Sequence, residues 1–172
     1  MFQQEVKKIY NVRTITKIAM LIAISMIGAM IKIQGSIAFD SMAGFYAAIA
    51  ISPLAGGLVG LLGHLLSAAT AGFPMTLPMH LIVAIEMFLF VYIFGWLYNK
   101  ASSWMAVLVA TLLNGPVAAL IVVPTSIMLG LPFSGWPLFT VIWIPLTIAS
   151  FLNISLATMI HKNISKGIKN EG

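Results

Sequence analysis

The stretch Ser52-Pro-Leu-Ala-Gly-Gly-Leu-Val-Gly-Leu-Leu-Gly-His-Leu-Leu-Ser67 decides how this chain folds. It contains no Lys, Arg, Asp or Glu, and Pro53 marks a tight turn at its start. Its small residues recur at helical spacing and form one smooth stripe, made of Gly56, Gly60, Gly63 and Ser67. Such a stripe lets a second helix approach closely within a membrane. The stretch therefore predicts a tightly packed apolar helix over residues 54–71.

The composition of the whole chain agrees with a membrane protein. Of 172 residues, 60% are hydrophobic and 8% are charged, whereas soluble domains carry about 25% charged residues. A membrane-spanning helix needs roughly 20 apolar residues, so six spans with short loops would use nearly the whole chain. We therefore expect an all-α fold, a compact bundle of six transmembrane helices that forms one domain over residues 1–172. An ATPase or enzymatic head would have to lie on another chain.

Apolar run lengths and Gly/Pro punctuation place the helices along the sequence. We expect them at residues 15–33, 41–52, 54–71, 80–98, 104–129 and 138–160. The connections at 34–40, 72–79 and 130–137 then lie on one side of the membrane. They are richer in Gly, Pro and polar residues than the turns on the other side. Two roles stay open for them: mobile covers of a pocket or plain connectors.

Basic residues predict the orientation of the bundle. With six spans, eight of the nine Lys and Arg residues fall on one side, and Lys32 falls on the other. Positive residues favour the cytoplasmic side, so we expect both termini in the cytoplasm and a multi-pass protein of the plasma membrane. The net charge of +5 thus indicates orientation towards a lipid bilayer rather than binding of nucleic acid. Residues 1–17 are polar and basic and lack a cleavable-signal pattern.

Glu86 is the sharpest sign of function. It lies about two turns into the predicted 80–98 helix, roughly 10 Å from its outer end. A carboxylate in hydrocarbon is costly unless it is paired, protonated or facing a wet cavity. We expect Glu86 to line a ligand pocket. The alternative is a purely structural pair with Lys32 or His80.

Other polar or aromatic residues are candidates for the same pocket. Asp40, Lys32 and His80 lie at the outer ends of their segments, and Asn114 precedes Gly115-Pro116 inside a helix. An apolar pocket with a few convergent polar groups is the usual small-ligand site. For His64 we expect a buried neutral side chain bonded to a carbonyl rather than a ligand contact.

The last helix adds an aromatic face to this prediction. Trp136, Thr140, Trp143 and Thr147 share one side of it. Two indoles with two hydroxyls would suit a planar heterocycle that carries polar substituents. An aromatic helix-packing face, with Trp136 at the membrane interface, is the alternative. The substrate-binding candidates are therefore Glu86, His80, Asp40, Trp143, Trp136, Asn114 and Lys32.

Several chemistries lack their sequence signals. The chain has no cysteine, no phosphate-binding Gly-rich loop and no His-Glu-x-x-His pair. The spacings of His64, His80 and Glu86 do not put them on a single helix face. We therefore expect no metal site, no cofactor and no catalytic residue. An intramembrane enzyme, or a stand-alone secondary transporter of a small organic solute, remains the alternative; the latter is expected to show internal repeats or more intramembrane charges.

The motif Ala19-x-x-x-Ala23, together with the 52–64 turn and Gly stripe, resembles the S components of energy-coupling factor (ECF) transporters. The resemblance covers nearly the whole chain. It implies a vitamin-binding subunit of an ABC-type importer, with the substrate held near the outer face. It also implies three partner chains, a transmembrane coupling subunit and two cytoplasmic ATPases. In such subunits the small-residue motif contacts the coupling subunit, which assigns partner docking to Ala19 and Ala23.

Two further stretches narrow the resemblance. Phe39-Asp-Ser-Met-Ala-Gly-Phe-Tyr46 and Gly72-Phe-Pro-Met-Thr-Leu-Pro-Met-His80 are similar to the proposed α-ribazole transporters, which salvage a cobalamin precursor. The nickel and cobalt members begin with a His-containing N-terminus, and Met1-Phe-Gln-Gln has no such ligand. This resemblance implies α-ribazole as the substrate and argues against uptake of a metal ion.

Overall fold

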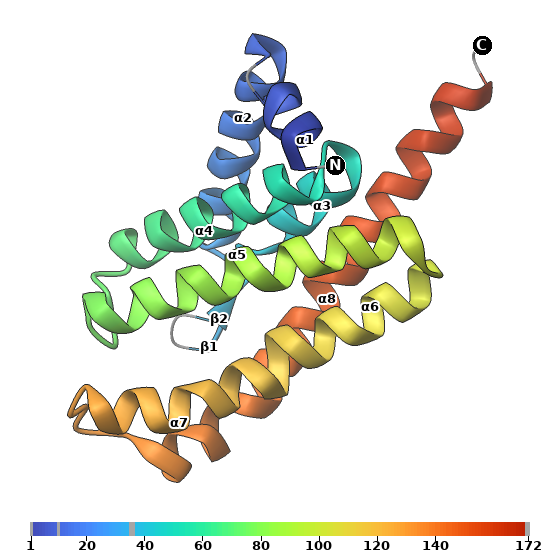
Figure 1. The fold of residues 1–172 in the computed structure, drawn as a ribbon. Helices are drawn as coiled ribbons and strands as arrows, with labels where there is room; N and C mark the ends of the chain where they lie inside the picture. The colour runs from blue at the N-terminus through green and yellow to red at the C-terminus, as the bar shows by residue number, and fades with distance from the viewer. Residues whose placement is uncertain (1, 10, 35–36, 171–172) are drawn as a thin grey trace.

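The computed structural model describes residues 2–9, 11–34 and 37–170 (Figure 1). Apart from one short antiparallel hairpin, its described elements are helices. In chain order they are α1 (Phe2–Ile9), α2 (Val12–Gly28), β1 (Lys32–Gln34), β2 (Ile37–Ala38), α3 (Met42–Ala50), α4 (Pro53–Thr70), α5 (Leu77–Lys100), α6 (Ser103–Leu112), the π-helix η1 (Leu113–Val117), α7 (Ala118–Met128) and α8 (Gly135–Asn170).

Four helical stretches within the described residues are long and apolar enough to cross a membrane. They are Pro53–Thr70, Leu77–Lys100, Ser103–Met128 and Gly135–Gly167. The other two predicted spans also form helices, but α2 has 17 residues and α3 has 9. The helical fold is therefore confirmed, and the count of six transmembrane helices is not.

The turn before α4 forms as the sequence predicts. The Ser52 hydroxyl accepts a hydrogen bond from the Ala55 N–H at 3.2 Å, and Pro53 occupies the first turn, where no N–H is needed. The glycine stripe of α4 then packs against its neighbours. A Cβ atom at Gly56 would overlap Ala48 of α3, and one at Gly63 would overlap the Ser25 hydroxyl of α2. The stripe is thus the contact surface that joins α4 to the helices before it.

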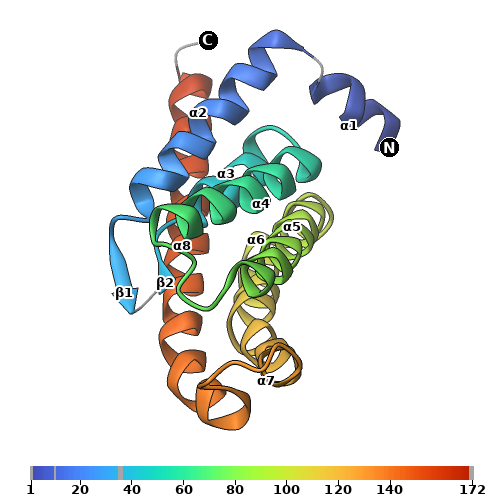
Figure 2. The same cartoon turned by 90° about the vertical axis from the view of Figure 1, so that its left-hand side faces the viewer.

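The core of the bundle lies between α3, α5, α6 and α8. Phe45 of α3 meets Phe94 of α5 edge to face, with ring centroids 5.2 Å apart. Both rings are fully buried, as is Ile154 of α8. Figures 1 and 2 show α4 and α5 side by side, with α8 crossing the bundle as its longest helix. These contacts fix the walls of the site described below.

Helix boundaries depart from the predictions where polar residues extend or end a helix. The first predicted helix, 15–33, ends at Gly28 because the chain turns there into β1. Helix α5 begins at Leu77 rather than residue 80, because Pro78 fits its first turn. Helix α8 continues past residue 160 through a basic stretch. Apolar run length therefore overestimates the end of α2 and underestimates the lengths of α5 and α8.

The predicted 104–129 helix contains a π-helical segment. In η1 the Ala118 N–H bonds to the Leu113 carbonyl, one residue further back than in an α-helix. Pro116 lies inside this segment, where it removes a backbone donor. The extra residue frees a carbonyl at Asn114, which lies within reach of Ser150 of α8, as described below.

Candidate functional site

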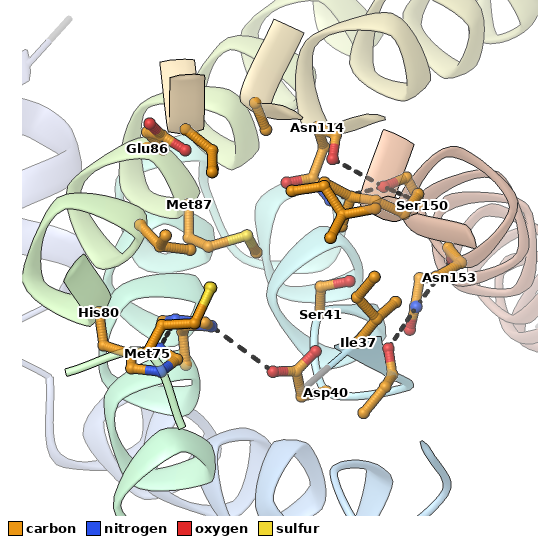
Figure 3. A pocket seen from close by; sticks show the side chains of 18 of the residues that line it. Ile37, Asp40, Ser41, Met75, His80, Glu86, Met87, Asn114, Ser150 and Asn153 are labelled. Atoms are coloured by element: carbon orange, nitrogen blue, oxygen red, sulfur yellow. Dashed lines mark hydrogen bonds and ion pairs between the residues drawn. The ribbon is translucent and has the colours of Figure 1, made fainter. Parts of the chain in front are cut away.

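A cavity of about 220 Å³ opens between the β2–α3 connection, α4, α5, η1–α7 and α8 (Figure 3). Its apolar wall includes Met75, Val83, Met87, Val122 and Ile142. Its polar lining comes from five different segments of the chain, and the side chains concerned are Asp40, Ser41, His64, His80, Glu86, Asn114, Ser150 and Asn153. Apolar walls with a few convergent polar groups are typical of a small-molecule site.

Glu86 lies in this lining with an unmet hydrogen bond. The residue is 7% exposed, and no described side chain or backbone group bonds to its Oε1 atom. It lies nine residues from the start of α5, about 13 Å along the helix axis. A buried polar group without a partner costs roughly 1–3 kcal/mol. Glu86 Oε1 can therefore accept a hydrogen bond from a molecule that enters the cavity.

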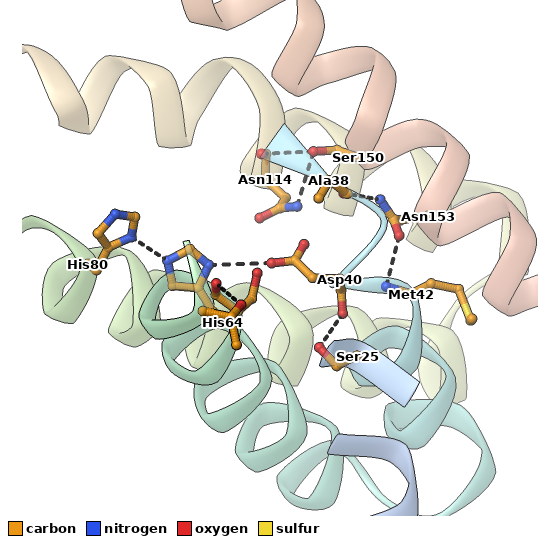
Figure 4. Close-up of polar contacts among 11 residues, drawn as sticks. Ser25, Ala38, Asp40, Met42, His64, His80, Asn114, Ser150 and Asn153 are labelled. Atoms are coloured by element: carbon orange, nitrogen blue, oxygen red, sulfur yellow. Dashed lines mark hydrogen bonds and ion pairs between the residues drawn. The ribbon is translucent and has the colours of Figure 1, made fainter. Parts of the chain in front are cut away.

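Three side chains of the cavity lining, those of Asp40, His64 and His80, form a row (Figure 4). Asp40 Oδ2 lies 3.7 Å from His64 Nδ1, and His64 Nε2 lies 3.1 Å from His80 Nδ1. His64 therefore bonds to another histidine rather than to the carbonyl that its sequence context suggests. His80 is 1% exposed, and among the described atoms its Nε2 has no hydrogen-bond partner.

The carboxylate of Asp40 sets the direction of this row. A carboxylate accepts, so it favours a proton on His64 Nδ1. In that tautomer His64 Nε2 accepts from His80 Nδ1, and His80 Nε2 is left as an acceptor. Glu86 Oε1 and His80 Nε2 are both buried without a hydrogen-bond partner among the described atoms.

Asn114 and Ser150 close the cavity on the side of η1. The Asn114 amide donates to Ser150 Oγ at 3.0 Å. The single Ser150 hydroxyl proton is shared between two carbonyls, that of Asn114 at 2.9 Å and that of Leu146 in its own helix at 2.7 Å. The π-helix therefore places a polar side chain in the cavity, with its freed carbonyl within reach of Ser150. Figure 4 shows the side-chain oxygen of Asn114 pointing away from Ser150.

Two residues that the sequence analysis did not single out hold Asp40 in place. Asn153 of α8 accepts a hydrogen bond from the Met42 N–H at 3.0 Å and donates to the Ala38 carbonyl at 3.2 Å. The Ser25 hydroxyl of α2 donates to the Asp40 carbonyl at 2.6 Å. An Asn within an apolar helix was the available signal for Asn153. Ser25 gives no comparable signal.

The structure brings together four of the seven predicted substrate-binding residues: Glu86, His80, Asp40 and Asn114. Lys32 begins β1, and its side chain lies outside the described part of the structure. Trp136 and Trp143 are 62% and 38% exposed, and neither lines the cavity. Both pack on Phe139 instead, and Trp143 stacks on that ring at 6.1 Å.

The face of α8 that does line the cavity is apolar towards the N-terminal end of the helix and small or polar further along it. It is formed by Ile142, Leu146, Ala149, Ser150 and Asn153. This face has the same helical period as the Trp face but a different register. Within the described residues, no group of three or more His, Asp or Glu side chains could hold a metal ion.

The outward face of α2 contrasts with this cavity. Ala19 and Ala23 lie on it and are exposed, as are Met20 at 61% and Ile27 at 64%. The opposite side of α2 buries Ile18 and Ser25 against the bundle. The two alanines thus lie on an apolar helix face that no described element covers.

Comparison with known proteins gives one finding. A family model described as "ECF transporter, substrate-specific component" matches residues 13–164. The match spans most of the chain and includes every element that lines the cavity, as well as the outward face of α2. No curated protein and no solved structure matches the chain.

Proposed function

The chain belongs to the family of substrate-specific components of ECF transporters, and from that premise we propose that it binds a vitamin or vitamin precursor in the cavity around Glu86. The family is one of transporters, not enzymes, and its members are multi-pass membrane proteins that bind small-molecule substrates. The unsatisfied carboxylate of Glu86 is the observation that carries the proposal.

The cavity specifies the chemistry of its ligand. Glu86 Oε1 and His80 Nε2 each need a hydrogen-bond donor, so the substrate presents at least two O–H or N–H groups. The walls of Met75, Val83 and Met87 favour an apolar or aromatic body. A compound with a flat apolar part and a hydroxylated part meets these conditions.

α-Ribazole is a compound of this class, because it joins a dimethylated benzimidazole to a ribose. We propose it as the substrate, with the ribose hydroxyls donating to Glu86 and His80. The benzimidazole then packs against the methionines, whose sulfur atoms make favourable contacts with aromatic rings. The resemblance of residues 39–46 and 72–80 to α-ribazole transporters supports the same choice.

We further propose that the exposed face of α2 docks on a transmembrane coupling subunit, which carries two cytoplasmic ATPases. Small residues four apart let a second helix approach closely, and Ala19 and Ala23 stand free of the rest of the chain. In this proposal both termini lie in the cytoplasm, and α2 and α3 complete a single six-helix domain when the full transporter surrounds them.

Ligand identification tests the function. The purified chain is extracted with organic solvent and analysed by mass spectrometry, then titrated with α-ribazole and with dimethylbenzimidazole alone. We expect α-ribazole to bind at least about tenfold more tightly, because the free base cannot supply the ribose hydroxyls. Equal affinity for the two compounds would reject the assignment of Glu86 and His80 to the sugar. Absence of any bound organic compound, with no binding in titration, would reject the substrate class.

A further inference from the structure

A second hollow lies away from the substrate cavity, along the groove between α6 and α8. Its volume is about 550 Å³, and the two helices run together in Figure 1. One end is apolar, with Val107, Leu108 and Phe151. The other end holds Lys162 and Lys166. The groove therefore has an apolar part and a cationic end.

The cationic end of the groove is formed by Lys162 and Lys166. Lys162 Nζ donates to Ser103 Oγ at 3.0 Å, and Lys166 follows one helical turn later. Among the described residues that line the groove, none is acidic. Two lysines and a hydroxyl thus line one end of the groove, an arrangement that suits a phosphate group.

The length of the groove matches one leaflet of a membrane. Eleven residues separate Phe151 from Lys162, which is about 16 Å along α8. The hydrocarbon core of a bilayer is about 30 Å thick, so half of it is about 15 Å. Trp104 lines the groove near the lysines and is 66% exposed, and Trp is enriched at the membrane–water interface. A molecule in this groove would have its charged end at that interface.

We propose that this groove binds a phospholipid with an anionic headgroup. The lysines and Ser103 hold the phosphate, and an acyl chain lies along Phe151 and Val107. The site depends on the membrane insertion of this chain and not on the identity of the transported substrate. A bound lipid would brace α6 against α8, the two helices that flank η1 and Asn114.

Native mass spectrometry of the purified full chain tests the proposal with phosphatidylglycerol and phosphatidylcholine. We expect one phosphatidylglycerol to bind more tightly than phosphatidylcholine. The double variant Lys162→Gln/Lys166→Gln should weaken phosphatidylglycerol binding by about thirty-fold, since each interfacial lysine contributes about a fivefold step. Lys162→Arg/Lys166→Arg keeps the charges and should retain the lipid.

A matched control removes two cations elsewhere. Arg13→Gln/Lys17→Gln makes the same charge change at the same spacing on α2, where both residues are exposed, and should alter lipid affinity by less than about twofold. Blocking the apolar part with Ser155→Trp should also displace the lipid, whereas Leu156→Trp, outside the groove lining, should not.

Three results would overturn the proposal. Equal affinity for the two lipids would remove the headgroup preference. Equal losses of lipid affinity in the α8 and α2 double variants would show that the net charge of the protein, and not this groove, determines lipid binding. Inorganic phosphate that binds as tightly as phosphatidylglycerol would make this a site for the free anion. Melting temperatures of all variants, measured without added lipid, separate these outcomes from loss of fold.

Discussion

The cavity around Glu86 and the outward face of α2 are incomplete in opposite ways. The cavity buries polar atoms that have no partner, Glu86 Oε1 and His80 Nε2, within the described structure. The α2 face exposes apolar side chains, among them Met20 and Ile27. A buried acceptor needs a small donor that can enter the fold, whereas an exposed strip of small residues needs another helix. The difference indicates two separate partners, a small ligand and a membrane protein.

The largest expected effect is the loss of substrate uptake when the proposed docking face of α2 is blocked. Ala19→Trp/Ala23→Trp should reduce substrate uptake by the assembled transporter to background, because bulky side chains hold a docking helix away. Ligand affinity of the isolated chain should stay within about twofold, since neither residue lines the cavity. Radiolabelled uptake and titration calorimetry measure the two effects.

The control for that variant is Ile144→Trp/Ile148→Trp, a pair with the same spacing on α8. Both residues are exposed, at 49% and 52%, and neither lies on the proposed docking face. This variant should support uptake. Loss of ligand binding in Ala19→Trp/Ala23→Trp would show that α2 belongs to the binding site. It would contradict the assignment of the cavity and the α2 face to separate partners.

The next effect concerns the scaffold that carries both regions. Gly56→Ala should destabilise the protein by about 1–3 kcal/mol, because the added methyl group overlaps Ala48 and must displace backbone. Gly167→Ala is the matched control: nothing lies within 4 Å of its Cβ position, so alanine should be neutral or stabilising by up to about 1 kcal/mol. Unfolding in detergent compares the two. Equal stability of both variants would mean that α4 does not pack on α3 as described.

The sequence predicted the packing of α4 well, for a physical reason. A Pro turn and a glycine stripe admit few arrangements, because only small residues allow backbones so close. The polar residues Glu86, His80 and Asp40 were also assigned to one region, since a charge in lipid has few places to go. Close-packed glycines and charged residues in apolar helices are therefore easy to assign from the sequence, because few positions in the fold can accommodate them.

The register of α8 could not be predicted in the same way. In a membrane both the lipid-facing and the core-facing side of a helix are apolar, so the period does not say which side is buried. The Trp136 and Trp143 face was therefore no better marked than that of Ile142 and Leu146. Asn153, Ser25 and the π-helix depend on contacts between segments far apart in the sequence.

A smaller effect should follow from the row of histidines. Asp40→Asn removes the carboxylate that directs the protons of His64 and His80, so ligand affinity should fall by about three- to tenfold. The hydrogen bond from the Ser25 hydroxyl to the Asp40 backbone carbonyl is untouched, which limits structural change. Titration calorimetry, with the melting temperature as a check on folding, measures this. An unchanged affinity would remove the row from the binding mechanism.

The smallest effect is expected at the aromatic face of α8. Trp143→Ala should change ligand affinity by less than about twofold, because the indole stacks on Phe139 outside the cavity. The same titration measures it, with Met87→Ala as a contrast, because Met87 lines the cavity and should weaken binding when truncated. A tenfold loss for Trp143→Ala would move the substrate to the outer face of α8.

Glu86→Gln tests the central claim most directly, because it keeps the shape of the side chain and removes its charge. Glu5→Gln makes the same change in α1, away from the cavity. Affinity for the substrate and the melting temperature of the ligand-free protein are measured for both variants. We expect affinity to fall by about one to two orders of magnitude for Glu86→Gln alone, with the ligand-free melting temperature unchanged or raised. Full affinity in a well-folded Glu86→Gln protein would contradict the assignment of this cavity as the substrate site.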